Sequence, residues 1–532
     1  MKVKHWLLMG SCIWFAGFGL PAQTHQTVYK TPSITVPDGS RLEYLFANKS
    51  AVRSRPLLNL PYGVQLRLEP LWFFGSYNSS FPYGPNLQDL WAGRGFNTIS
   101  KTGFTVEWGP LQLGLLPAFS AAQNAEFELM EPIYATTGGY VNPGHRNIDF
   151  PQRMGEKSLA NLTPGESFIR LTLGSFSTGF GWEPMWLGPG KDMALLLSNN
   201  APAFPHFDIG LDSMVTPLGG MEARLFWGCL ERSPWAVDYA WPDDFPEHQE
   251  QRLLTGLVLG YSPAFIPGLT LGFGRIFYSY LDSVLTVDQL FSPIVQRFSR
   301  IFRQSEGDTD GQDNQDQLLG VSFGWAFPVV GFELWGEFGR NDSSDYHRDF
   351  MGMPEHSRAF LLGVRQHLFW PEAWRFSVLA EIVELGRSGT RTVRPTPPWY
   401  VHHIIREGAT QQGQLLGAWI GPGSNSQLLA LDAYYEDMRF GLYFRRVGWD
   451  MDTFYKQWDG QTGTFLFVDT RLHAGLDASV RIWQFDLSGG IDFLYNLNRY
   501  YSNPDYERGL FGNEHDTLNI NIYLSIRWVP AW

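Results

Sequence analysis

Apolar and polar positions alternate along the last segment of the chain. Every second residue from Leu518 to Trp528 is apolar, and the residues between them are Asn, Tyr, Ser or Arg. A period of two is that of a β-strand with one apolar face and one polar face. Soluble sandwiches contain such strands as well, so this segment alone does not decide the fold class.

The same alternation recurs through most of the chain. Charged residues stand at several of the polar positions, including Arg170, Glu333, Glu381, Arg481 and Asp492. These would be costly against lipid but are hydrated when they face a water-filled lumen. No internal sequence repeat of about 20–50 residues is found, which disfavours a propeller. The further alternating segments are Val64–Leu68, Phe104–Trp108, Leu111–Leu115, Ile169–Leu173, Leu269–Phe273, Val321–Trp325, Phe332–Leu334, Val378–Ile382, Phe440–Phe444, Val480–Ile482 and Ile491–Phe493.

The pattern predicts an all-β protein, a transmembrane antiparallel β-barrel of about 16–18 strands formed by residues 61–532. A barrel of this size is wider than its own side chains can fill, so its lumen must either conduct or be plugged. The long polar stretches predicted as outer loops are Tyr77–Arg94, Met130–Thr163, Ser233–Gln251, Arg303–Gln317, Asn341–His356 and Arg387–Gln414.

The start of the chain reads as an export signal. Met1–His5 is basic, Trp6–Leu20 is mostly apolar, and Pro21-Ala22 follows. This predicts a signal peptide over residues 1–22 and a location in the bacterial outer membrane. Residues 23–60 are predicted to be a periplasmic segment with one short helix, because Ser40 and Glu43 have the spacing of a capping box.

Composition narrows the class further. Aromatic residues make up 16% of the chain, whereas the mean hydropathy is slightly negative at −0.18. Rings at two membrane interfaces around a polar lumen account for both values. The formal net charge of −13 argues against a nucleic-acid partner, which would require clustered Lys and Arg.

Residues 178–210 have a different composition. Gly and Pro are too frequent there for an interior strand. Trp and Phe alternate with Asn, Glu and His, a combination that suits a sugar, since rings pack on its C–H face and polar groups bond its hydroxyls. An aromatic-rich barrel rim without a ligand has the same composition, so both interpretations stay open.

Part of this segment resembles the Wzi capsule-assembly family. Gly188–Gly190, followed by Leu196–Ala201 and Phe204-Pro205, is similar to the central signature of that family. Ser54–Pro56 is a weaker match to another of its motifs.

A second signature of the family resembles Trp399–His403 followed by Gly417–Gly423. The family usually has a Tyr a few residues past the His and an acidic residue after the glycines. Here Ile405 or Arg406 and Ser424-Asn425 stand at those places.

The resemblance implies an outer-membrane barrel of about eighteen strands, plugged from below by N-terminal helices. It also implies a non-enzymatic lectin that attaches exported capsular polysaccharide to the cell surface, with no cofactor. The expected partners are capsular or exopolysaccharide and outer-membrane lipid, and the expected state is a monomer. The acidic chain favours a neutral or lightly charged glycan.

The residues predicted to contact the polysaccharide carry rings, amides or charges in and around the two signatures. They are Trp182, Glu183, Trp186, Lys191, Asn199, Asn200, His206, Trp399, Tyr400, His402 and His403. No residue is predicted to be catalytic or to bind a metal. If His402 and His403 lie on a strand they point to opposite faces and cannot share a metal ion. A polar rim pair, a sugar contact and a catalytic base are the interpretations considered, in that order.

Two other functions stay open at this point. In a porin-like sugar channel the lumen conducts, and in a lipid-modifying barrel enzyme His402 or His403 acts as the base. The Asp-rich segment 307–316 also raises the question of calcium, although it lacks the EF-hand spacing and a solvated outer loop is favoured.

Overall fold

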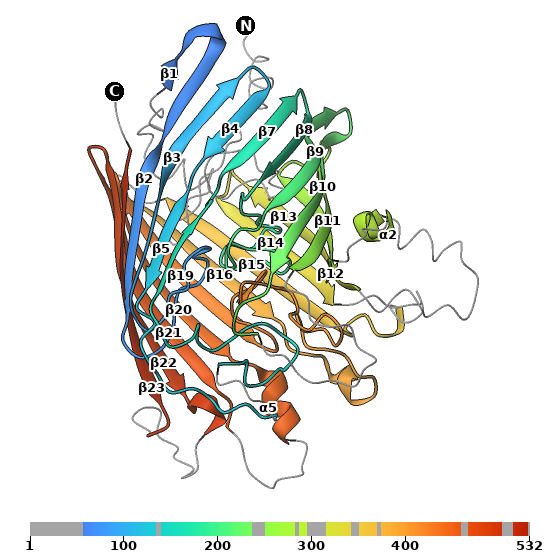
Figure 1. The fold of residues 1–532 in the computed structure, drawn as a ribbon, viewed down its shortest axis with the longest axis vertical. Coiled ribbons are helices and arrows are strands. Elements are labelled where there is room, and N and C mark those ends of the chain that lie inside the picture. Colours follow the sequence, from blue (N-terminus) through green and yellow to red (C-terminus); the bar gives the residue numbers. More distant parts are fainter. Residues whose placement is uncertain are drawn as a thin grey trace, which may run out of the picture.

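The computed structural model describes residues 57–134, 140–236, 251–281, 287–294, 315–341, 351–369, 374–458, 467–502 and 514–529. All of their strands but two, β17 (Thr410–Gln411) and β18 (Gln414–Leu415), which pair only with each other, form one antiparallel sheet (Figure 1). This sheet closes on itself where β2 (Val64–Asn78) pairs with β23 (Thr517–Trp528). Closure leaves the ring without free edges, as a lipid-embedded sheet requires.

The ring contains 18 strands, and the predicted fold class is therefore confirmed. Of the 21 strand segments of the sheet, β1 (Leu57–Asn59) pairs with β2 outside the ring. Two wall strands are each split into two segments. The segments β4 (Leu111–Leu115) and β5 (Ala118–Ala122) both pair with β3 (Gly95–Trp108), and on their other side lie β7 (Phe168–Leu173) and β6 (Leu159–Thr163).

The other elements follow in chain order. They are β8 (Phe176–Gly181), β9 (His206–Thr216), β10 (Gly219–Glu231), β11 (Gln251–Pro263), β12 (Leu269–Tyr280), α2 (Val287–Leu290), β13 (Gln315–Phe327), β14 (Phe332–Asn341), β15 (Arg358–Phe369), β16 (Arg375–Glu384), β17 (Thr410–Gln411), β18 (Gln414–Leu415), β19 (Asn425–Tyr435), β20 (Met438–Gly448), α5 (Met451–Trp458), β21 (Thr470–Ile482) and β22 (Phe485–Leu497), with short 3-10 turns at Pro61–Gly63, Gly389–Thr392 and Arg499–Tyr501.

The two faces of the wall differ as the alternation predicts. In β23, Ile522 and Leu524 are about half exposed on the outer face, whereas Asn519 and Asn521 are buried on the inner face. The same division holds across β7, where Ile169 is exposed and Arg170 is buried. Apolar side chains thus meet lipid and polar side chains meet the lumen.

The two ends of the barrel have connections of different length. At one end neighbouring strands are joined by short turns, such as the one between β21 and β22 (Figure 1). Val529 lies at the same end, because its N–H donates to the Gln484 carbonyl in that turn. At the other end the connections are long, including residues 182–205 and 385–424. Outer-membrane barrels have short periplasmic turns and long outer loops, so the long connections mark the outer end.

Two of these long connections fold back into the barrel. Met193, Leu195 and Leu197 from one connection pack with Tyr400 and Leu416 from the other. This cluster also includes inward-facing residues of the wall, and we call the two connections together the plug. The wall residues of the cluster include Phe226, Leu254, Ile276, Leu318, Trp335, Leu361 and Val383.

Glycines in the wall make room for the plug. A Cβ atom built on Gly274 of β12 would lie 2.6 Å from Cδ1 of Leu196, and one on Gly339 of β14 would lie 2.8 Å from Cη2 of Trp399. Both separations are well below ordinary contact distance, so a larger residue at either place would push the plug away.

Some sequence expectations lie outside the described residues. These are the signal peptide, the short helix with Ser40 and Glu43, the N-terminal helical plug and most of the Asp-rich segment 307–316. Of that segment Asp316 is described, and its carboxylate accepts a hydrogen bond from the Tyr278 hydroxyl. No helix in the described part of the chain is long and apolar enough to cross a membrane.

Candidate functional site

The 182–205 connection is fixed to the wall through its backbone. The N–H groups of Gly190 and Leu195 donate to the two carboxylate oxygens of Glu337, at 3.0 and 2.8 Å. Those of Lys191 and Asp192 donate to the two oxygens of Glu381, at 2.8 and 3.1 Å. Each oxygen of both buried carboxylates thus accepts one plug N–H. These four hydrogen bonds between buried groups hold this connection in one position.

The two sequence signatures bind each other. The Tyr400 hydroxyl donates to the Leu195 carbonyl at 2.8 Å and accepts from the Ala418 N–H at 2.7 Å. The Asn200 amide donates to the Leu415 carbonyl at 3.0 Å. A Cβ on Gly417 would lie 2.3 Å from the Tyr400 hydroxyl, so this glycine allows the close approach. The signatures therefore build the interior of the plug.

Most of the predicted contact residues lie inside this assembly. The buried ones are Glu183, Asn199, Asn200, His206, Trp399, Tyr400 and His402; Trp182, Trp186 and Lys191 are half-buried, and His403 is exposed. Glu183 also forms an ion pair with Arg170, at 2.6 Å, which in turn pairs with Asp208. The sequence predicts that residues 178–210 contain no interior strand. This is wrong for the two ends of the segment, which belong to β8 and β9.

The histidine pair does not lie on a strand, because residues 401–408 form an irregular turn. Nδ1 of His402 accepts from the N–H groups of Ile404 and Ile405, at 3.3 and 3.1 Å. Burial lowers the pKa of His402 to about 3, and the neighbouring His403 lowers it as well. A neutral ring that accepts two backbone bonds has a structural role in the turn.

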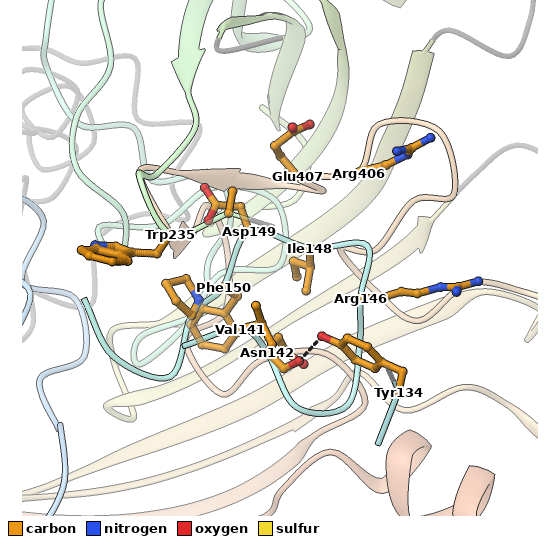
Figure 2. Close-up of a pocket in the computed structure, with 12 residues that line it drawn as sticks. Tyr134, Val141, Asn142, Arg146, Ile148, Asp149, Phe150, Trp235, Arg406 and Glu407 are labelled. Atoms are coloured by element: carbon orange, nitrogen blue, oxygen red, sulfur yellow. Dashed lines mark hydrogen bonds between the residues drawn. The ribbon is translucent and has the colours of Figure 1, made fainter. Parts of the chain in front are cut away.

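A hollow lies where three outer connections meet (Figure 2). It is small, with a cavity volume of about 10 Å³, and it is partly open to solvent. Tyr134 and residues 141–151 supply one wall, residues 235–236 a second, and Arg406 and Glu407 a third. Aromatic rings of Tyr134, Phe150 and Trp235 share the lining with polar groups, which is the mixture that a sugar needs.

The carboxylate of Asp149, which is one of the lining residues, is held in place by Ser233. Both of its oxygens accept hydrogen bonds from Ser233, one from the hydroxyl and one from the N–H, each at 2.6 Å. Burial raises the pKa of Asp149, whereas these two bonds act in the opposite direction. This pair ties the 141–151 segment of the lining to the connection after β10.

Sequence reasoning did not place this hollow. Its lining comes from three connections that are distant in the chain, and no local motif marks them. The available signals were weak: residues 130–163 were expected to form an outer loop, and Arg406 departs from the usual family pattern.

Comparisons with known proteins agree with this architecture. Residues 266–486 match the sequence model of the family described as capsule assembly protein Wzi. That range includes the second signature, with Trp399 and Tyr400, but not the first. No curated protein matches the chain.

Among solved structures, the chain is similar to Wzi of Escherichia coli, with a TM-score of 0.53 and 15% sequence identity over 87% of this chain and 85% of that one. That protein is described as an outer-membrane, carbohydrate-binding β-barrel involved in group 1 capsule assembly. OccAB1 of Acinetobacter baumannii matches with a TM-score of 0.41 and 8% identity over 86% of this chain and 96% of that one, too distant to inform function. The protein is thus an outer-membrane β-barrel, and its predicted resemblance to the Wzi capsule-assembly family is confirmed.

Proposed function

We propose that this protein binds exported capsular or extracellular polysaccharide at its outer end and attaches or organises it at the cell surface, without an enzymatic step. In this proposal it acts as a monomer embedded in outer-membrane lipid. The observation that carries the proposal is the plug. Its apolar core occupies the lumen across β10–β16, and its Arg406 and Glu407 line an aromatic hollow at the outer end.

A plug of this kind suits a binding protein better than a channel. Its backbone is fixed by hydrogen bonds to two buried carboxyl groups of the wall, so the surface residues around it are held before a ligand arrives. Preorganisation lowers the entropic cost of binding, which matters for a flexible polysaccharide. The second signature, with Tyr400 at its centre, would then serve binding through rigidity, while residues such as Trp235 and His403 make the contacts.

The test is made on cells. The gene is deleted, and cell-bound and shed polysaccharide are measured separately; we expect the total to stay similar and the shed fraction to rise. Restoring the gene should return the polysaccharide to the cells. An unchanged distribution between cells and medium in the deletion strain would contradict the proposal.

A further inference from the structure

Three aromatic side chains form a continuous surface on the inner wall of the barrel. Trp72 and Phe74 of β2 and Tyr523 of β23 belong to the inward-facing set of residues, and their neighbours Phe73 and Leu524 are exposed on the outer face. The ring centroids of Trp72 and Phe74 are 6.2 Å apart, and those of Phe74 and Tyr523 are 6.1 Å apart. Neighbouring ring planes differ by 32° and 27°. We call these three rings the luminal aromatic face.

The wall holds these rings in place. Gly490 of β22 is the cross-strand partner of Tyr523, and a Cβ atom built on it would lie 2.7 Å from the Tyr523 hydroxyl oxygen and 2.8 Å from its Cζ. Glycine thus lets the ring lie against the wall. At the other end of the face, the indole N–H of Trp72 donates to the Ser525 hydroxyl at 2.8 Å. Phe74 and Tyr523 nevertheless stay partly exposed.

Solvent access to the inner wall increases toward the periplasmic end. The exposed fraction of the arginine side chain is 40% for Arg481 beside the β21–β22 turn, 13% for Arg439, and 5% for Arg445, which pairs with the plug. Through the strand register, Tyr523 lies in the same row of paired residues as Asp477, the ion-pair partner of Arg439. The luminal aromatic face therefore lies between the periplasmic end and the plug.

Carboxylates lie beside the luminal aromatic face. Asp477 of β21 shares the row of Tyr523, and Asp492 of β22 stands two residues from that row on the same face of the wall. Asp477 forms an ion pair with Arg439, and Asp492 accepts a hydrogen bond from the Tyr443 hydroxyl at 2.8 Å. Carboxylates accept hydrogen bonds from sugar hydroxyls, and aromatic rings pack against the C–H face of a sugar. The carboxylates here outnumber the guanidinium group, which disfavours an acidic ligand.

We propose that the luminal aromatic face binds a neutral hexose chain that enters the lumen from the periplasmic end, with a sugar ring packed on Phe74 and Tyr523. Inward positions of a barrel wall are normally polar, so partly exposed rings at these positions need a ligand to cover them. Rings that the wall already holds in place lose little entropy on binding. This site is separate from the outer end of the barrel and goes beyond the proposed function.

The test uses the full-length protein in detergent. The probes are maltohexaose and laminarihexaose, which are neutral hexose chains of α and β linkage, and the hexamer of galacturonic acid, which is acidic. Binding is measured by titration calorimetry at one fixed ionic strength. We expect at least one neutral chain to bind, and the acidic hexamer to bind at least about tenfold more weakly because the carboxylates of the wall repel it.

Variants locate the binding on the rings. Phe74→Leu should weaken binding about tenfold, because it keeps an apolar side chain in the wall but removes the flat ring face. Phe74→Tyr keeps the ring and should keep the binding. Gly490→Ala should also weaken binding, since the added methyl group displaces the Tyr523 ring. Phe73→Leu is the matched control, because Phe73 is the neighbouring ring on the outer face.

The possible outcomes decide the matter as follows. The proposal is overturned if neither neutral chain binds, if the acidic hexamer binds as tightly as the neutral chains, or if Phe73→Leu weakens binding as much as Phe74→Leu. Binding that is seen only after deletion of residues 23–56 would assign the luminal aromatic face to that segment and would also overturn it. Retention of polysaccharide by cells tests the outer end separately, so either proposal can fail alone.

Discussion

At the scale of single residues, burial separates side chains that build the plug from side chains that a ligand can reach. Trp399, Tyr400 and His402 are almost fully buried, so their replacement acts first on the plug. Trp235 is 37% exposed and lines the hollow, although no sequence motif singles it out. The sequence shows which residue types suit a sugar, whereas exposure depends on contacts between distant connections.

Replacement of Trp235 tests direct contact with the sugar. Trp235→Ala should cost about 1–2 kcal/mol of binding free energy, because a ring face is lost from the hollow. The measurement is a titration with polysaccharide purified from cells that express the protein. Trp483→Ala serves as the control, since Trp483 is exposed in the short β21–β22 turn at the opposite end. Equal losses in both variants would count against a contact at the hollow.

Replacement of His402 tests its neutral state. The pKa of His402 is about 3 in the folded protein, against an ordinary value of 6.5, so its contribution to stability is present above pH 6.5 and is lost as the pH falls toward 3. In His402→Asn the side-chain oxygen can accept the same backbone bonds without titrating. Between pH 7 and pH 5, the wild type should lose up to about 2 kcal/mol more unfolding free energy than the variant.

The readout for His402 is denaturant unfolding of the detergent-solubilised barrel at several pH values. His403→Asn is the control, since this exposed neighbour should leave the pH dependence of unfolding nearly unchanged. Parallel curves for the wild type and His402→Asn would contradict a buried neutral imidazole.

At the scale of elements, the strands were predictable and the plug was not. A strand such as β23 has a local period that any fold must respect. The plug segments have no period, and their partners in the wall are scattered over several strands. The sequence does contain one signal of the plug. Alternation fails at Leu253-Leu254 and at Leu318-Leu319, because the inward-facing Leu254 and Leu318 belong to the apolar cluster that includes the plug.

The attachment of the 182–205 connection to the wall gives an element-scale prediction. Glu337→Gln replaces one acceptor oxygen with an amide that must face the N–H of Gly190 or Leu195. A buried donor left without an acceptor costs about 1–3 kcal/mol, and we expect unfolding free energy to fall by that amount. Denaturant unfolding measures it. Glu107 forms a partly exposed ion pair with Arg67, so Glu107→Gln should change the unfolding free energy little. An equal loss of unfolding free energy in both variants would contradict the attachment.

At the scale of the whole molecule, alternation predicts a ring in lipid but not what fills it. The family resemblance implies a plug of N-terminal helices, which lies outside the described residues, whereas the described plug enters from the outer end. The two arrangements are compatible. The ring depends on main-chain pairing between neighbours, and its filling depends on long connections whose path no local pattern specifies.

Removing one part of the plug should therefore open the lumen without opening the ring. Residues 186–202 can be replaced by a short Gly/Ser linker, because β8 and β9 are adjacent and stay paired up to Gly181 and His206. The apolar contacts of Leu195 and Leu197 with the wall are then lost. Single-channel conductance in a planar bilayer should rise at least about tenfold over the intact protein, since an unfilled ring of 18 strands holds an aqueous channel.

High conductance of the intact protein would favour the porin-like function. Low conductance of both proteins, with the variant shown to be folded by its β-sheet circular dichroism, would mean that the lumen is closed by other parts of the chain.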